Sequence, residues 1–288
     1  MARGTLHTVL VFVCVACALA VAVQKDTKSR RRFAKEPISV SAFNVKSFGL
    51  AKMRNETLAS VLTKIVRRYD VILIQEIRDI TGNSCRQLWE MVNASDPSRP
   101  YGMVISDRLG RGRQKEQYMY MYRLDRLELL SVHQYNDRPD DLFEREPYSV
   151  LFRIKAATST KFALVGVHIK PRKAVAEIGS LYDVYLDILS HWKGVQNVLI
   201  MGDLNADCAY VREKDLLPLA IYNSSSFDWL IGWEADTTTT DSTHCAYDRF
   251  VAAGTELKSA IEPNTIGVYH FDKDFVLDQK TERFDSLK

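Results

Sequence analysis

Polar side chains follow four apolar runs of the sequence, at positions where strands of a sheet would end. They are Asn44, Glu76, His168, and Asp203 with Asn205. One such residue has an ordinary explanation, because strand ends are polar by default and a lone histidine beside a core is usually only hydrogen-bonded. Polar residues at four strand ends favour a site, because matching ends converge on one rim of a sheet.

The residue types suit the cleavage of phosphodiester bonds. Glu76 and Asp203 offer the hard oxygen ligands that Mg²⁺ prefers. Asn44 and Asn205 can donate hydrogen bonds to phosphate oxygens, and His168 can carry a proton near neutral pH. A zinc site is disfavoured, because no group of cysteines and histidines has the spacing of zinc ligands.

The apolar pattern predicts the elements that position these residues. Helical spacing runs from Leu58 to Val66 and from about Ala174 to Trp192. Strands are predicted over Ile38 to Val45, Val71 to Ile74, Tyr101 to Ile105, Gln117 to Arg123, Leu127 to Tyr135, Tyr148 to Lys155, Lys161 to His168, Val195 to Met201 and Cys245 to Ala252. We therefore expect an α/β fold in which two stacked, mostly antiparallel β-sheets are flanked by helices, a four-layer α/β sandwich.

The N-terminal segment has the features of a signal peptide. Arg3 precedes an uncharged apolar run from Val9 to Val23, and we expect residues 1–22 to be removed on export. The alternative, a membrane anchor, is disfavoured because about 15 apolar residues fall short of the roughly 20 that span a bilayer. Residues 23–37 are basic and predict a solvated arm, with a DNA-binding tail as the less favoured alternative. Residues 38–288 form the expected catalytic domain.

The cysteines, the glycosylation sequons and the net charge bear on whether the protein is secreted and whether it binds nucleic acid. Cys85, Cys208 and Cys245 lie beyond the predicted signal peptide, and three cysteines cannot all pair with one another. The sequons at Asn55, Asn93 and Asn223 fit a secreted glycoprotein. The formal net charge of +3 is too small to indicate nucleic-acid binding by itself.

Short segments of the chain resemble the signatures of the endonuclease/exonuclease/phosphatase superfamily and, within it, the deoxyribonuclease I family. The superfamily segments are Ser41 to Val45, Gln75-Glu76, Gly166 to His168 and Gly202 to Asn205. The more specific segments are Leu109 to Arg111, Lys115 to Tyr118, Arg145 to Pro147, Asn205 to Cys208, Asp236 to Thr238 and Ser242 to Arg249. The resemblance extends from residue 38 to about residue 285.

The resemblance implies a secreted endonuclease that hydrolyses double-stranded DNA to 5′-phosphate ends with Mg²⁺ or Mn²⁺. Glu76, helped by Asp203, would hold the catalytic divalent ion, and Asn44 and Asn205 would orient phosphate oxygens. Glu116 would pair with His168 and fix its tautomer, so that the imidazole can donate a proton.

Further roles follow from the same resemblance. Arg78 and Arg145 would reach the DNA, with solvated surface arginines as the alternative for both. A structural Ca²⁺ would bind a loop that begins at Asp236 and Thr238. Cys208 and Cys245 would form the structural disulfide, which leaves Cys85 over.

The C-terminal segment departs from the family pattern. In the deoxyribonuclease I family, the residue that corresponds to Asp248 accepts a hydrogen bond from a second histidine. That histidine belongs to a Ser-Asp-His motif, which opens the last buried strand. An ungapped count places Ser286-Leu287-Lys288 at that motif, and His270 belongs to a different predicted strand. We therefore expect a domain truncated at its C-terminus, with the last strand missing and Asp248 without its partner.

Three functions compete on these observations. The leading one is a secreted, metal-dependent endonuclease acting on double-stranded DNA, without a membrane span and as a monomer. A catalytically impaired, DNA-binding pseudoenzyme is the alternative that the missing histidine motivates. A phosphodiesterase of phospholipid head groups is disfavoured by the segments at Lys115 to Tyr118, Arg145 to Pro147 and Cys245 to Arg249.

Overall fold

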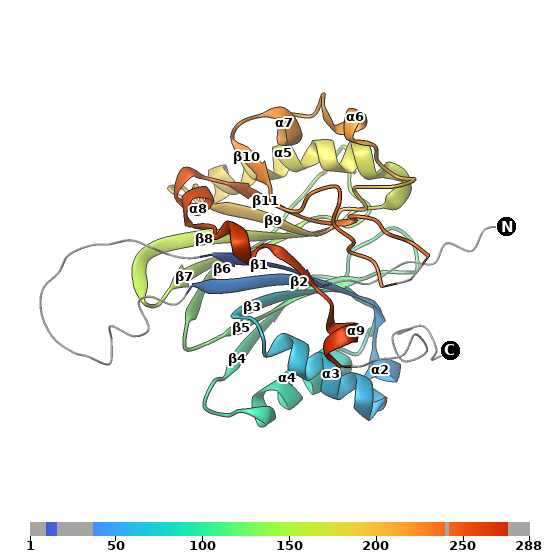
Figure 1. Ribbon diagram of the computed structural model, residues 1–288, viewed down its shortest axis with the longest axis vertical. Coiled ribbons are helices and arrows are strands. Elements are labelled where there is room, and N and C mark those ends of the chain that lie inside the picture. The colour runs from blue at the N-terminus through green and yellow to red at the C-terminus, as the bar shows by residue number, and fades with distance from the viewer. Residues whose placement is uncertain (1–9, 16–36, 240–241, 276–288) are drawn as a thin grey trace, which may run out of the picture.

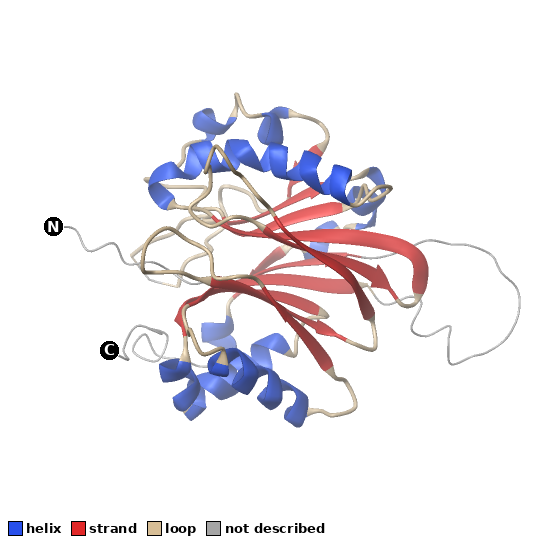
Figure 2. Cartoon of the chain, turned by 180° about the vertical axis from the view of Figure 1, so that it is seen from behind, coloured by secondary structure: helices blue, strands red, loops and turns tan. Residues whose placement is uncertain are grey.

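Two stacked β-sheets form the centre of the molecule, and helices cover both outer faces (Figures 1 and 2). The computed structural model describes residues 10–15, 37–239 and 242–275, the first of these segments by its backbone. Each sheet has six strands in the described residues. This arrangement confirms the predicted α/β sandwich.

The first sheet has the strand order β12-β1-β2-β3-β5-β4. Its strands are β1 (Leu10–Val15), β2 (Ile38–Phe48), β3 (Val71–Ile77), β4 (Tyr101–Ile105), β5 (Gln117–Arg123) and β12 (Gly267–Tyr269). β2 and β3 are parallel, and the other pairings given for this sheet are antiparallel.

The second sheet has the strand order β10-β11-β9-β8-β7-β6. Its strands are β6 (Leu127–Gln134), β7 (Tyr148–Ile154), β8 (Ala157–His168), β9 (Val198–Asp203), β10 (Phe227–Trp229) and β11 (Asp248–Ala253). β8 and β9 are parallel and joined through helix α5, whereas the remaining pairings of this sheet are antiparallel.

Helices cover the outer face of each sheet (Figure 1). Over the first sheet lie α2 (Leu50–Arg54), α3 (Glu56–Val66), α4 (Asn83–Ser95) and α9 (Phe271–Asp274). Over the second sheet lie α5 (Ala174–His191), α6 (Glu213–Leu216) and α7 (Ala220–Asn223). Shorter elements are α8 (Thr255–Ala260) and the 3₁₀ turns η1 (Pro171–Lys173) and η2 (Pro263–Thr265).

Three apolar layers stabilise the sandwich. The layer between the sheets includes Tyr120, Phe152 and Phe250, and one further layer lies between each sheet and its helices. The central strands are therefore buried on both faces, which explains why β3 and β9 have no exposed position. The helix α4 was not predicted, because only its narrow stripe of Cys85, Leu88 and Val92 is apolar and buried.

Strand β1 lies between β2 and β12 in the first sheet. Its backbone pairs antiparallel to β2, from Val15 opposite Ile38 to Leu10 opposite Phe43. β1 belongs to the segment predicted to be removed on export, so the first sheet would lose this strand once residues 1–22 are cleaved. Of the predicted signal peptide only residues 10–15 are described, so its removal stays a prediction, and Ser286 to Lys288 lie outside the described residues.

Two predicted strand boundaries are wrong for identifiable reasons. β11 begins at Asp248 rather than Cys245, because the Cys245 carbonyl accepts hydrogen bonds from the backbone and hydroxyl of Thr237 instead of a neighbouring strand. β9 begins at Val198 rather than Val195, because Val195 closes a turn by bonding back to Trp192. Both errors lie at strand starts, where turns compete with strand pairing.

None of the helices in the described part of the chain is long and apolar enough to cross a membrane.

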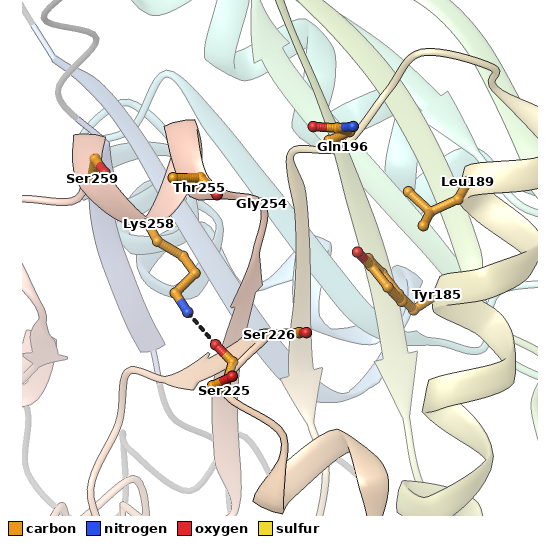
Figure 3. Close-up of a pocket in the computed structure, with 9 residues that line it drawn as sticks. All are labelled: Tyr185, Leu189, Gln196, Ser225, Ser226, Gly254, Thr255, Lys258 and Ser259. Atoms are coloured by element: carbon orange, nitrogen blue, oxygen red, sulfur yellow. Dashed lines mark hydrogen bonds between the residues drawn. The ribbon is translucent and has the colours of Figure 1, made fainter.

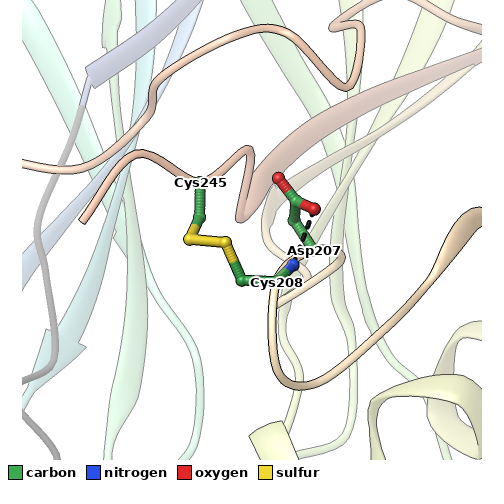
Figure 4. A group of neighbouring side chains, drawn as sticks. All are labelled: Asp207, Cys208 and Cys245. Carbon is green, nitrogen blue, oxygen red and sulfur yellow. Dashed lines mark hydrogen bonds between the residues drawn. A yellow bond between two sulfur atoms is a disulfide. The ribbon is translucent and has the colours of Figure 1, made fainter.

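Cys208 and Cys245 form a disulfide, as the resemblance implied, with their Cα atoms 5.9 Å apart. Asp207 supports the bridge on both sides, because its carboxylate accepts hydrogen bonds from Cys208 N at 2.6 Å and Ala246 N at 2.7 Å (Figure 4). The carboxylate and sulfur atoms cluster, but the sulfurs are bonded to each other and offer no thiolate to a metal. Cys85 is a buried free thiol whose pKa is raised by burial to about 12.

The disulfide should contribute substantially to stability, because it closes a loop of 37 residues. The reduced chain entropy of the unfolded state corresponds to about 4 kcal/mol of stability. The double variant Cys208→Ser/Cys245→Ser should therefore unfold about 10 °C lower in calorimetry. Reducing agent should lower the unfolding temperature of the wild type and leave that of the double variant unchanged. An equal response of both proteins to reductant would contradict the assignment.

Candidate active site

The polar strand ends meet on one rim of the sandwich. His168 of β8 pairs in register with Asp203 of β9, and Asp203 pairs with Asp248 of β11. Asn44 of β2 lies opposite Gln75 of β3, one residue before Glu76. The site is therefore assembled from strands of both sheets, as their convergence on one rim predicted.

The backbone is constrained at this rim. Glu76 has φ 56° and Asn205 has φ 47°, a left-handed conformation that residues other than glycine seldom adopt. Gly202 has φ 134°, and a Cβ built there would lie 2.2 Å from the Val167 carbonyl oxygen. Glycine thus permits the close approach of β9 to β8 that places Asp203 beside His168.

Gln75 connects the two sheets beneath the site, a role that the sequence analysis missed. Its side chain is fully buried, its Nε2 donates to Val167 O at 2.6 Å, and its Oε1 accepts from Asp203 N at 3.2 Å. The sequence signal for this role was an amide directly after the four apolar residues Val71 to Ile74. Tyr118 acts similarly, because its hydroxyl accepts a hydrogen bond from His168 N at 2.8 Å.

Asn44 bridges the two carboxylates that were predicted to hold a metal. Its Nδ2 lies 3.1 Å from Glu76 Oε1 and 3.0 Å from Asp203 Oδ2. The backbone N–H of Ser47 donates to the other Glu76 oxygen at 2.9 Å. Burial raises the pKa of Asp203, and the neighbouring Glu76 charge adds to this, against opposing contributions from His168 and Asn44. Two buried carboxylates this close favour a bound cation.

His168 is held by a single strong partner. Its Nδ1 lies 2.9 Å from Glu116 Oε2, whereas its Nε2 is 3.8 Å from Asp203 Oδ2 and 4.0 Å from Glu76 Oε1. Burial would raise the pKa of Glu116, but the opposite charges of His168 and two arginines outweigh it and lower the pKa to about 2. The ionised Glu116 therefore orients the imidazole and leaves Nε2 free to exchange a proton.

The two arginines predicted to reach DNA lie on carboxylates of the site. Arg78 Nη2 is 2.9 Å from Glu116 Oε1 and 3.2 Å from Glu76 Oε2. Arg145 Nε donates to His168 O at 3.0 Å and lies 3.6 Å from Glu116 Oε2. Both arginines therefore help to position the Glu116–His168 pair, and their contact with DNA stays a prediction.

Three buried polar atoms at the rim have no hydrogen-bond partner among the described residues. They are Asn44 Oδ1, His168 Nε2 and Asp248 Oδ1. Burial, with the nearby Asp203 charge, raises the pKa of Asp248 well above its usual range. A buried polar atom without a hydrogen-bond partner needs a ligand, an ion or a water molecule to satisfy it. Carboxylate and amide oxygens without thiolates suit Mg²⁺ or Mn²⁺.

Asn205 lies beside Asp203, the predicted metal ligand. Its backbone N–H donates to Asp203 Oδ1 at 2.9 Å. One of its amide hydrogens is used to hold the loop after His168, because Nδ2 donates to Ile169 O at 2.9 Å. The predicted donation to phosphate therefore depends on the second amide hydrogen.

Asp236 and Thr238, the predicted calcium ligands, lie together in one loop. Asp236 Oδ1 accepts from Thr238 N at 2.9 Å and from its hydroxyl at 2.6 Å, and His244 Nδ1 is 2.7 Å from Asp236 Oδ2. Thr238 also donates to Thr243 O. Residues 240–241 of this loop are outside the described chain, and calcium binding stays a prediction.

A cavity of about 600 Å³ lies away from this rim (Figure 3). It is lined by side chains of α5 and α8 and by Gln196, which precedes β9. Lys258 within it donates to Ser225 O at 2.8 Å. None of the predicted site residues lines this cavity.

Comparison with known proteins agrees with the geometry of the rim. Residues 41–265 match the Endonuclease/Exonuclease/phosphatase family. Deoxyribonuclease-1 of Bos taurus is 43% identical over 238 residues, which cover 81% of this chain and 83% of that protein. Deoxyribonuclease-1-like 2 of Mus musculus is 40% identical over 242 residues, covering 84% of this chain and 86% of that protein. Deoxyribonuclease-1 of Homo sapiens is 41% identical, covering 81% and 83%.

Solved structures show the same fold at low sequence identity. An endonuclease/exonuclease/phosphatase family protein from Bacteroides thetaiotaomicron is 15% identical with a TM-score of 0.53, and the match covers 75% of this chain and 82% of that chain. The mannosyl-6-phosphatase of the same organism is 14% identical with a TM-score of 0.51, covering 75% and 85%. The chain therefore belongs to the endonuclease/exonuclease/phosphatase family and, within it, to the relatives of deoxyribonuclease I.

Proposed function

We propose that this protein is a divalent-metal-dependent endonuclease that hydrolyses phosphodiester bonds of double-stranded DNA and leaves 5′-phosphate ends. The observation that carries the proposal is the Glu116–His168 pair, 2.9 Å apart, with the free Nε2 directed at Glu76 and Asp203. A fixed proton carrier beside two hard oxygen ligands is what phosphodiester hydrolysis requires. The relatives named deoxyribonuclease support DNA as the substrate.

Glu76 and Asp203 would hold the Mg²⁺ or Mn²⁺ ion. When bound, the ion supplies positive charge that stabilises the phosphate as water attacks it. Asn44 would keep both carboxylates in place through its Nδ2 and present its unpaired Oδ1 to the site. Asn205 would use its remaining amide hydrogen to orient a phosphate oxygen.

Proton transfer is assigned to two residues. His168 Nε2 would give a proton to the departing 3′ oxygen as the bond between phosphorus and that oxygen breaks, while Glu116 stabilises the charged imidazole. Asp248, in register with Asp203, would assist the loss of a proton from the attacking water. Burial and the nearby Asp203 charge raise the pKa of Asp248 well above the usual range of a carboxyl group.

Secretion and calcium binding complete the proposal. The Cys208–Cys245 disulfide fits an oxidising compartment, and residues 1–22 would direct export. Asn93 is a poor glycosylation acceptor, because its amide bonds to Trp89 O and Tyr101 O and its oxygen accepts from Tyr101 N. A structural Ca²⁺ would bind at Asp236 and Thr238, and calcium-dependent thermal unfolding tests this.

One observation favours the second candidate, a DNA-binding protein with impaired cleavage. Asp248 Oδ1 has no hydrogen-bond partner among the described residues, where the family resemblance implies a histidine. Comparison of DNA binding with DNA cleavage at equal metal concentration separates the two functions. Binding without cleavage favours the second candidate.

The variant Glu76→Gln should lose metal-supported cleavage by about 10³-fold, because one anionic ligand is removed from the metal site. The variant should still fold, with a lower unfolding temperature, because both Glu76 oxygens accept hydrogen bonds and the new NH2 group would face a donor. Cleavage of supercoiled plasmid across a Mg²⁺ titration measures the effect. Full activity in this variant would remove Glu76 from the metal site.

The variant His168→Ala should lose about 10²- to 10⁴-fold in kcat, because proton transfer to the leaving oxygen is lost. Glu116→Gln should be less damaging, about 10- to 100-fold, because it removes only the charge that orients and stabilises the imidazole. Single-turnover cleavage of a duplex oligonucleotide measures both. A larger loss in Glu116→Gln than in His168→Ala would contradict this division of roles.

Stability below pH 4.5 should depend on Glu116. Its pKa falls from 4.5 to about 2 in the folded protein, so ionised Glu116 stabilises the fold fully above pH 4.5 and this contribution is lost as the pH falls towards 2. The shift corresponds to about 3 kcal/mol. Urea unfolding between pH 5 and 3 should therefore show a smaller loss of stability in Glu116→Gln than in the wild type. Equal pH dependence would contradict the strength of the pair.

A further inference from the structure

The charges inside the active site do not favour the approach of DNA by themselves. Glu76, Glu116 and Asp203 are buried acidic groups at the rim. The cations that adjoin them, Arg78 and Arg145, already lie within 3.6 Å of these carboxylates. Cations that attract and hold the DNA backbone must therefore lie outside this cluster.

Two exposed cations lie on the 3₁₀ turn that follows the catalytic histidine. Arg172 and Lys173 belong to η1 and are exposed, and neither side chain forms a hydrogen bond or ion pair within the described residues. Lys170, two residues earlier, is different, because its Nζ lies 2.5 Å from Glu144 Oε2. Arg172 and Lys173 thus have their full charge available to a ligand.

The turn that presents these cations is attached firmly to the site. Ile169 N donates to Asp203 O at 2.9 Å, and Ile169 O accepts from Asn205 Nδ2 at 2.9 Å. Lys170 N donates to Glu177 Oε2 at 3.2 Å, and the buried Glu177 also accepts from Glu144 N at 3.3 Å. The turn is therefore held at a defined place beside His168 rather than on a loose loop.

The reach of the chain places the cations within a few nucleotides of the scissile bond. Arg172 follows His168 by four residues, and a chain of that length spans at most ~14 Å. Phosphates of one DNA strand recur every ~3.4 Å along the helix axis, so this distance corresponds to about four of them. Beyond the turn, α5 carries the exposed Asp183, whose negative charge would disfavour a duplex that continued along the helix.

We propose that Arg172 and Lys173 bind backbone phosphates of the DNA strand on the α5 side of the active site. This inference rests on the proposed function and adds to it a phosphate-binding subsite, independent of base sequence. The contacts hold the duplex while His168 and the metal carboxylates act on the scissile phosphate. Their effect is on DNA affinity and its dependence on salt, not on the chemical step.

The test compares two double variants of the full chain, each prepared on a His168→Ala background so that the DNA stays intact. Arg172→Gln/Lys173→Gln removes the proposed contacts. Lys161→Gln/Lys193→Gln removes two exposed charges at the opposite end of the second sheet, since Lys161 precedes His168 by seven residues of β8, or ~23 Å of strand. Binding of a fluorescent duplex is measured by anisotropy in Ca²⁺ across a range of KCl concentrations.

The expected result is a shallower salt dependence for the first variant only. The slope of log Kd against log [KCl] should fall by about 1 to 2, because each phosphate contact contributes about 0.9. An unchanged slope, or an equal change in the control variant, would overturn the proposal. Loss of heparin binding with unchanged DNA binding would also overturn it. Cleavage by the chain with His168 intact is assayed separately, so a failure of the nuclease function is distinguished from a failure of this subsite.

Discussion

The interaction on which the site depends is the hydrogen-bonded bridge that Gln75 makes between the two sheets. One amide, buried in the apolar interior, satisfies Val167 O of β8 and Asp203 N of β9 from its place on β3. A buried amide without partners costs several kcal/mol, so the sheets are favoured in the single alignment that provides both. That alignment brings Glu76 of one sheet to Asp203 and His168 of the other.

The buried carboxyl groups that this alignment brings together lower the stability of the folded chain. Burial raises the pKa of both Asp203 and Asp248, so the folded chain has a reduced preference for their ionised forms. Glu116 shows the opposite behaviour, because His168 and two arginines surround it and its pKa falls to about 2. The stability lost through the buried Asp203 and Asp248 is thus partly offset by the ion pairs that position His168, and a cation bound at the proposed metal site would offset more.

The backbone conformations and hydrogen bonds at the rim restrict the movement of the residues there. Gly202 allows β9 to approach β8 closely, and Glu76 and Asn205 adopt left-handed backbone conformations that the surrounding hydrogen bonds maintain. Glu177 fastens the turn after His168 to the loop that carries Arg145. The polar groups of the rim are therefore placed by backbone geometry, whereas the proposed contacts with DNA are made by exposed side chains outside the cluster.

The sequence by itself determined the residue types of the site and most of the strands that carry them, because apolar periodicity records which segments are buried. The polar residues at the carboxyl ends of those strands, from Asn44 to Asn205, could therefore be predicted to meet on one rim, whereas only the structure placed Asp248 opposite Asp203. Tertiary structure alone decided that Arg78 and Arg145 lie on Glu116, that Gln75 joins the sheets and that β1 pairs with β2. Local pattern contains no information on such partners, because they depend on which distant segments the packing of the core brings into contact.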